Sequence, residues 1–155
     1  MKKYEFTGET KTVPLLFENV TLHRIQAITS FENVVAGELG GWIEKEENLS
    51  QGGNAWVGGN AQVSGNAQVR GNARVGGDAR VFSINHILTI GVIGSRDDFT
   101  TFYRDKDNEI TVKCGCFSGK IDKFLEKVAQ THGDSKYAQV YKKAVELAKL
   151  QILTG

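Results

Sequence analysis

Apolar and polar residues alternate with a fixed period of six across the middle of the chain. Residues 53–82 are five consecutive units of the form Gly-(Asn/Asp)-Ala-x-Val-x. Within each unit the alanine and the valine stand two positions apart, and side chains two apart on an extended segment share one face. The pattern therefore predicts two buried columns. They consist of Ala55, Ala61, Ala67, Ala73 and Ala79, and of Val57, Val63, Val69, Val75 and Val81.

The other positions of each unit predict a turn and an outward-facing residue. Glycine followed by asparagine or aspartate tolerates left-handed backbone geometry, which is typical of tight turns. The residue between alanine and valine points away from the buried columns. We interpret this row either as a solvated face or as a protein-interaction surface, because tryptophan and arginine are frequent interface anchors. The row consists of Trp56, Gln62, Gln68, Arg74 and Arg80.

The repeat resembles the hexapeptide repeat of left-handed parallel β-helix proteins, in which three units close one triangular coil. Ile87 and Ile93 continue the valine column, and Ile43 and Leu49 fall on the alanine column upstream. The fold class that we expect is therefore mainly β. Its centre is a short left-handed parallel β-helix over residues 37–93, with the clean units at 53–82.

The flanking segments predict a cap and a small terminal domain. Tyr4 and Phe6 alternate with polar residues, so we expect residues 1–36 to form an N-terminal β cap over the open end of the repeat. Residues 99–104 and 110–117 have strand-like composition, and apolar residues at helical spacing follow them. Residues 94–155 are therefore expected to form a C-terminal ββαα domain.

Composition limits the partners. The chain has 155 residues and a formal net charge of +1. So small a charge argues against nonspecific DNA binding, which relies on many lysine and arginine contacts to phosphate. No apolar run approaches the roughly 20 residues of a membrane span, and no signal peptide is evident. We expect a cytoplasmic protein without a membrane partner.

The two cysteines predict packing rather than chemistry. Cys114 and Cys116 are too few and too close for a disulfide framework. A lone Cys-x-Cys also lacks the ligand spacing of a structural zinc site. We therefore expect two buried thiols that face the C-terminal helices, with no metal and no cofactor; zinc ligation by the two cysteines is the minor alternative.

The whole chain is also similar to small proteins encoded by bacteriophages and prophages. The similarity lies in the sequences AGELGGWI at residues 36–43 and NLS at residues 48–50, and in GSRDDFTTFYR and VKCGCFSG near the C-terminus. Leu22, Arg24, Ile25 and Ala27 belong to the same pattern. The resemblance implies a protein that works in the cytoplasm of a bacterial host and counters host defence.

Two groups of residues are candidates for a site. Many hexapeptide-repeat enzymes are acyltransferases with a histidine base, and His86, just after the clean units, is the candidate here. A second group combines arginines, hydroxyls and an aromatic ring, which suits the phosphates and base of a nucleotide. This group consists of Ser95, Arg96, Thr100, Thr101, Tyr103 and Arg104.

No adjacent nucleophile and base can be recognised, so we expect a non-catalytic binding protein. The hypothesis is an inhibitor of host defence that sequesters a small anionic nucleotide or blocks a defence protein. An acyltransferase based on His86 and a structural phage component are the alternatives. Because a few coils bury little core and stacked repeats need neighbours, we also expect a homotrimer.

Overall fold

The computed structural model describes residues 2–15, 17–95 and 97–154. Its strands are β1 (Tyr4–Leu15), β2 (Glu18–Ala27), β3 (Leu39–Ile43), β4 (Trp56–Val57), β5 (Gln62–Val63), β6 (Arg74–Val75), β7 (Arg80–Val81), β8 (Ile87–Ile93), β9 (Asp98–Arg104), β10 (Ile110–Cys114) and β11 (Phe117–Lys120). The helices are α1 (Ile121–His132) and α2 (Lys136–Thr154), and two 3-10 turns are η1 (Glu46–Asn48) and η2 (Ile84–His86).

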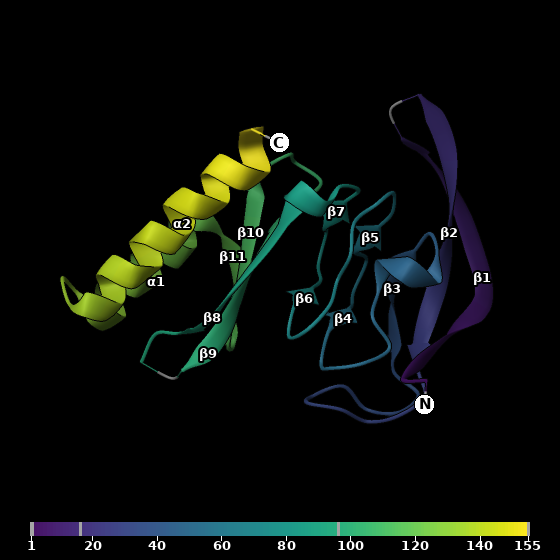
Figure 1. Ribbon diagram of the computed structural model, residues 1–155, viewed down its shortest axis with the longest axis horizontal. Coiled ribbons are helices and arrows are strands. Elements are labelled where there is room, and N and C mark those ends of the chain that lie inside the picture. Colours follow the sequence, from purple (N-terminus) through teal and green to yellow (C-terminus); the bar gives the residue numbers. More distant parts are fainter. Residues whose placement is uncertain (1, 16, 96, 155) are drawn as a thin grey trace.

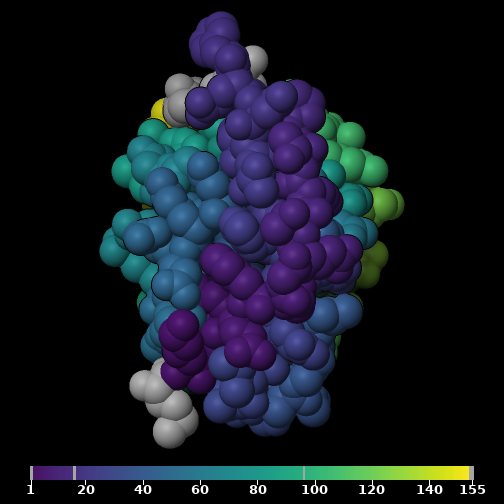
Figure 2. All heavy atoms as spheres, turned by 90° about the vertical axis from the view of Figure 1, so that its right-hand side faces the viewer, coloured from purple at the N-terminus to yellow at the C-terminus, as the bar shows by residue number. Residues whose placement is uncertain are grey.

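These elements form successive layers (Figure 1). The long β1–β2 hairpin lies on one side, and the six-residue units lie next to it. The sheet of β8–β11 follows, and α1 and α2 cover its far face. Figure 2 shows the hairpin running along the outer face of the units. The repeat is therefore enclosed between two layers that come from opposite ends of the chain.

The first sheet mixes two kinds of pairing. Among the described residues its strand order is β1-β2-β3-β5-β7. Strands β1, β2 and β3 pair antiparallel, whereas β3, β5 and β7 pair parallel, with Trp42 opposite Gln62 and Gln62 opposite Arg80. The N-terminal hairpin thus extends the same sheet as two of the repeat strands.

Other units of the repeat belong to a second, separate sheet. Strands β4 and β6 pair parallel, with Trp56 opposite Arg74, eighteen residues or three units apart. Gln62 and Arg80 show the same spacing in the first sheet. Consecutive units therefore lie on different faces, and only every third unit shares a sheet.

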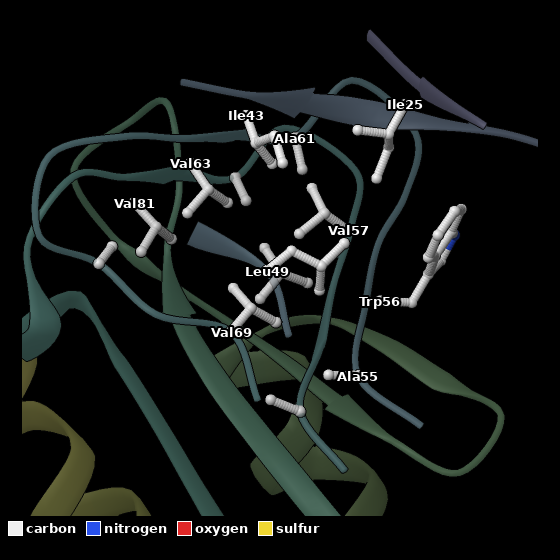
Figure 3. Packing of buried hydrophobic residues seen from close by; sticks show 14 of the residues in the cluster. Ile25, Ile43, Leu49, Ala55, Trp56, Val57, Ala61, Val63, Val69 and Val81 are labelled. Carbon is white, nitrogen blue, oxygen red and sulfur yellow. The ribbon is translucent and has the colours of Figure 1, made fainter. Parts of the chain in front are cut away.

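The predicted alanine and valine columns are confirmed as the core of the repeat. All ten residues are at most 3% exposed. Ile43 and Leu49 join this core, but they stand in line with the valine column rather than the predicted alanine column, because Ile43 pairs with Val63 and Leu49 with Val69. Figure 3 shows the aliphatic side chains converging between the short strands. Glycine is needed at the turns: Gly65 has φ of +62°, and a methyl group there would lie 2.5 Å from the carbonyl oxygen of Phe82.

The C-terminal part has its own core. Strands β8, β9, β10 and β11 form an antiparallel sheet. Side chains alternate along β9, so that Phe102 packs with the helices whereas Tyr103 packs with the core of the repeat. The prediction of two buried thiols is only partly right. Cys114 is half-buried beside the helices, but Cys116 lies in the β10–β11 turn and is exposed.

The predicted fold class is wrong. Instead of a parallel β-helix with a β cap and a ββαα unit, the chain has a mixed sheet, an antiparallel sheet, a two-stranded sheet and two terminal helices. Each strand of the repeat contributes only two residues to a ladder, because the other residues of each six-residue unit form the turn and the connection to the next strand. The long ladders are antiparallel and come from outside the repeat. One of them includes β8. Ile87, at its start, packs against the core of the repeat as predicted, but Ile93, at its end, packs against the C-terminal core instead.

No helix in the described part of the chain is long and apolar enough to cross a membrane.

Asn48 fastens the first turn of the repeat from within. Its side chain is fully buried, Nδ2 donates to the carbonyls of Gly65 and Ala67 at 3.2 and 2.8 Å, and Oδ1 accepts from the N–H of Lys45 at 2.9 Å. We predict that Asn48→Ala lowers the free energy of unfolding by about 2–3 kcal/mol, because it removes these partners from buried backbone groups. Urea denaturation measures the loss.

Asn60→Ala is the matched control, since Asn60 occupies the repeat's asparagine position but is exposed. Its effect should stay within about 0.5 kcal/mol. Equal losses in the two variants would contradict the role assigned to Asn48.

Candidate ligand-binding groove

The nucleotide-type cluster predicted from sequence is not gathered into one site. Arg96 lies outside the described residues, and Ser95 stands in the turn after β8. Thr100 and Thr101 are 0% and 2% exposed and point to opposite faces of β9. The hydroxyl of Thr100 contacts Cys114 Sγ at 3.3 Å, whereas that of Thr101 accepts from the backbone N–H of Arg74 at 3.1 Å. Both threonines therefore have internal partners.

Tyr103 and Arg104 also serve internal contacts. Tyr103 is 2% exposed, on the face toward the repeat. The guanidinium of Arg104 stacks on the ring of Phe82 and donates to Asn108 Oδ1. The arginine that sequence analysis assigned to a ligand thus helps to fix the end of the β9–β10 hairpin.

His86, the candidate acyltransfer base, is buried. Its Nδ1 accepts from the backbone N–H of Phe82 at 3.2 Å, and Nη1 of Arg104 lies 3.2 Å from Nε2. Burial, and then the charge of Arg104, lower the pKa of His86 to about 4. The imidazole is neutral at physiological pH, but neighbours occupy both nitrogens. This geometry suits packing rather than proton transfer to a substrate.

The outward row of the repeat is divided among several faces. Trp56 and Arg74 are partners in the β4–β6 sheet, and Gln62 and Arg80 are partners in the five-stranded sheet. Gln68 is exposed and belongs to neither sheet. The five residues therefore do not form one continuous surface, because neighbouring units of the repeat face different directions.

Arg74 and Lys113 mark a groove between two layers. Arg74 projects from β6 of the repeat, and Lys113 from the face of β10 that is turned toward the repeat. Both residues line two adjoining hollows, of about 450 and 190 Å³. We call these two hollows together the interlayer groove. No ion pair of either side chain is found within the described residues.

The larger hollow is polar and receives residues from three parts of the chain. Nη1 of Arg74 donates to Asn33 Oδ1 at 2.8 Å, which connects the repeat to the loop after β2. Nδ2 of Asn54 donates to Asn72 Oδ1 at 3.3 Å on the turn column of the repeat. The C-terminal sheet adds an aromatic ring, Phe99. The hollow also contains the carboxylates Glu32, Asp97 and Asp98.

The smaller hollow lies on the other side of the two cations. Trp56 of β4 and Ser118 of β11 line it, together with backbone at Gly58 and Gly76. No aspartate or glutamate belongs to its described lining. The positive charge of Arg74 also acts on Lys3 outside the hollow: burial, and then this charge, lower the pKa of Lys3 to about 8. The electrostatic environment of the smaller hollow therefore favours an anion.

Another cavity, of about 420 Å³, lies between the β10–β11 hairpin and the helices. The ring centroids of Phe117 and Tyr141 lie 5.6 and 5.5 Å from that of Phe124. These aromatic contacts belong to the packing of the C-terminal core. Ser95 is the member of the predicted cluster that borders this cavity.

Sequence analysis missed Lys113 and assigned Arg74 and Trp56 to a different kind of surface. Strand alternation is the signal that could have found Lys113. Val112 packs with the helices, and side chains alternate along a strand, so the next residue, Lys113, points to the opposite face. Its pairing with Thr101, which contacts Arg74, then brings it to the repeat. Only the packing of the two sheets shows that the cations share a groove.

Comparisons with known proteins give a partial match. No protein-family model matches the chain. Over 61 residues the chain is 39% identical to YdcK of Escherichia coli (strain K12), described as an uncharacterized acetyltransferase. The match covers 37% of this chain and 19% of YdcK, so the chain spans about a fifth of that relative's length. This supports a resemblance to an acetyltransferase and gives no support for a phage or prophage origin.

The buried His86 predicts a specific pH dependence of stability. Its pKa is about 4 in the folded protein, compared with an ordinary 6.5. Between these values the unfolded chain binds a proton that the folded chain does not, so the free energy of unfolding falls as pH drops from 6.5 to 4. We expect this side chain to account for about 2–3 kcal/mol of the acid-induced loss.

Denaturant titrations between pH 4 and 7 measure this loss. His86→Asn, which retains an amide oxygen as an acceptor for the Phe82 N–H, should have a shallower slope than the parent. His132→Asn is the control and should keep the parent slope, because His86 is intact. Parallel pH profiles of the parent and His86→Asn would show that His86 is not neutral and buried in solution.

Proposed function

We propose that this chain is a non-catalytic binding protein that holds a small anionic, nucleotide-type ligand in the interlayer groove. One observation carries the proposal: Arg74 and Lys113 come from different layers and line the same two hollows. Neither side chain has an ion-pair partner among the described residues. An anion in the groove would therefore meet a positive charge from each layer.

The chemistry of the groove fits a ligand with two unlike ends. A guanidinium and an ammonium suit phosphate oxygens. The larger hollow provides the amides of Asn54 and Asn72, the carboxylates and the ring of Phe99, which suit the hydroxyls and flat base of a nucleoside. Its described lining contains no histidine or cysteine. These features support binding and not covalent catalysis.

The finer resemblance to phage and prophage proteins suggests what such binding achieves. A protein that encloses a nucleotide signal removes it from the host's defence enzymes without chemistry. Blocking a defence protein is the second form of the same proposal. It has less support, because the outward residues of the repeat are divided among separate faces.

An acyltransferase is the alternative that a specific observation favours, namely the similarity to YdcK over 61 residues. Acetyl-CoA also carries phosphates on an adenosine, so either function would place phosphate in the groove. Turnover of acetyl-CoA separates the two. A structural phage component is the remaining alternative, and it rests on the resemblance alone.

We also propose that the protein is a homotrimer, with α2 contributing to the interface. Leu147 and Leu153 on this helix are 48% and 52% exposed. Light scattering should give three times the chain mass of 17.0 kDa, and Leu147→Glu with Leu153→Glu should shift the mass toward a single chain. Lys149→Glu on an exposed part of the same helix is the control. A parent protein that is monomeric at micromolar concentration would contradict the trimer.

The binding proposal is tested by identifying the ligand and then removing the cations. Small molecules released from the purified protein by denaturation are identified by mass spectrometry, and a panel of linear and cyclic nucleotides is titrated by calorimetry. We predict that Arg74→Ala and Lys113→Ala each weaken binding by about 1.5–3 kcal/mol, the value of a charge-assisted hydrogen bond.

Arg80→Ala is the matched control, because Arg80 occupies the same position of the next unit but lies in the other sheet. It should leave the affinity unchanged. Arg104→Ala tests the site expected from sequence, and a loss confined to this variant would move the site away from the groove. Absence of any bound nucleotide would contradict the proposal.

A further inference from the structure

Among the buried side-chain nitrogen and oxygen atoms of the described residues, one lacks a hydrogen-bond partner, and its residue lines the interlayer groove. This atom is Nε1 of Trp56. The residue is 5% exposed, and an indole nitrogen can only donate. A buried donor without an acceptor typically costs about 1–3 kcal/mol. Buried polar groups in native structures are rarely left without a partner, so this unsatisfied N–H requires an explanation.

Its neighbours fix the orientation of the indole. A methyl group at Gly40 would lie 2.7 Å from Cζ2 of Trp56, so the benzene ring packs directly on the backbone of β3. Phe31 makes an edge contact, with its ring centroid 5.5 Å away. Figure 3 shows the nitrogen on the edge of the ring that is turned away from the aliphatic core. The N–H therefore has a fixed direction.

The space beside this N–H belongs to the smaller hollow. A methyl group at Gly58, another residue that lines the hollow, would lie 3.5 Å from Nε1. Glycine at this position leaves the space open. Arg74 stands opposite Trp56 in the ladder, and Lys113 and Ser118 stand opposite each other in the β10–β11 hairpin. Donors thus approach the hollow from the repeat on one side and from the C-terminal sheet on the other.

We propose that the smaller hollow is an oxyanion subsite that binds a phosphoryl group, with the Trp56 N–H as one of its donors. This inference rests on the proposed function, because it assigns the phosphate end of the ligand. Arg74 and Lys113 supply the charge, and Ser118, whose side chain also hydrogen-bonds that of Tyr103, lines the subsite. The volume of about 190 Å³ suits a phosphoryl group, and the larger hollow beyond the two cations takes the rest of the ligand.

The two tryptophans of the chain make this subsite directly observable. Trp42 and Trp56 give two indole N–H signals in a nitrogen-15 correlation spectrum, and Trp42→Phe assigns them. Inorganic phosphate, adenosine monophosphate and adenosine are titrated into the intact protein. We expect both phosphate compounds to move the Trp56 signal downfield with saturation, because its proton gains a charged acceptor. Adenosine should leave it in place, and the Trp42 signal should not move.

Trp56→Phe removes the N–H and retains an aromatic ring. It should weaken binding of inorganic phosphate about tenfold, whereas Trp42→Phe should not. If Trp56→Phe does not fold, the spectra of the parent protein still decide. Shifts of the two indole signals by equal amounts would indicate a general salt effect and would overturn the subsite.

The outcomes separate this inference from the proposed function. Nucleotide binding that depends on Arg74 but leaves the Trp56 signal in place would overturn the subsite and retain the binding function. This result would also mean that water satisfies the N–H. A Trp56 shift with inorganic phosphate, but no binding of any nucleotide, would support the subsite and overturn the nucleotide function. Movement of neither signal, with no binding, would overturn both.

Discussion

Burial of the alanine and valine columns is the interaction on which the rest of the structure depends. Two residues per strand make too short a ladder to hold a sheet together alone, so the side chains packed between the units supply the cohesion. Backbone carbonyls at the end of the repeat have no further unit to pair with and must find other donors. Lys3 supplies one: its Nζ donates to Ala55 O at 2.6 Å and to Gly52 O at 3.2 Å. A lysine from the first residues of the chain thus completes the repeat, at the cost of burying its charge.

The alanine and valine columns could be predicted because they depend on a periodicity between residues close in sequence. The two terminal helices could be predicted for the same reason, since the helical spacing of apolar residues is also local. The fold class was not predictable in the same way. Period-six spacing does not reveal that β1 and β2 extend one of the repeat's own sheets, nor that β8 leaves the valine column to pair with β9. Ile87 satisfies both arrangements, because it packs against the core of the repeat while it pairs with Tyr103 of β9. Ile93 pairs with Asp98 and packs against the C-terminal core.

The candidate site shows the same division. The sequence placed Arg74 and Trp56 in one outward row. Arg74 faces out of the repeat into the groove, but Trp56 is 5% exposed and belongs to the core cluster of the repeat. Strand alternation indicates which way Lys113 points, but its partner across the groove, Arg74, is distant in sequence and could not be predicted. The predicted cluster at residues 95–104 failed for a complementary reason. Side chains alternate along β9, so Thr100 and Thr101, although adjacent in sequence, point to opposite faces of the sheet.

The groove lies where two hydrophobic cores meet, and this position explains its chemistry. Tyr103 belongs to the core of the repeat although its strand belongs to the C-terminal sheet, so the two layers pack firmly at this residue. Beside it, polar side chains from both layers face each other across a gap that neither core fills. Donors from both layers therefore collect in this gap, among them the guanidinium of Arg74, the ammonium of Lys113 and the indole N–H of Trp56. In the proposed complex, a bound anion would give the indole N–H the acceptor that it lacks within the protein, and a buried donor without an acceptor is costly. The residues of the proposed site would then be the ones whose contribution to stability depends most on the ligand.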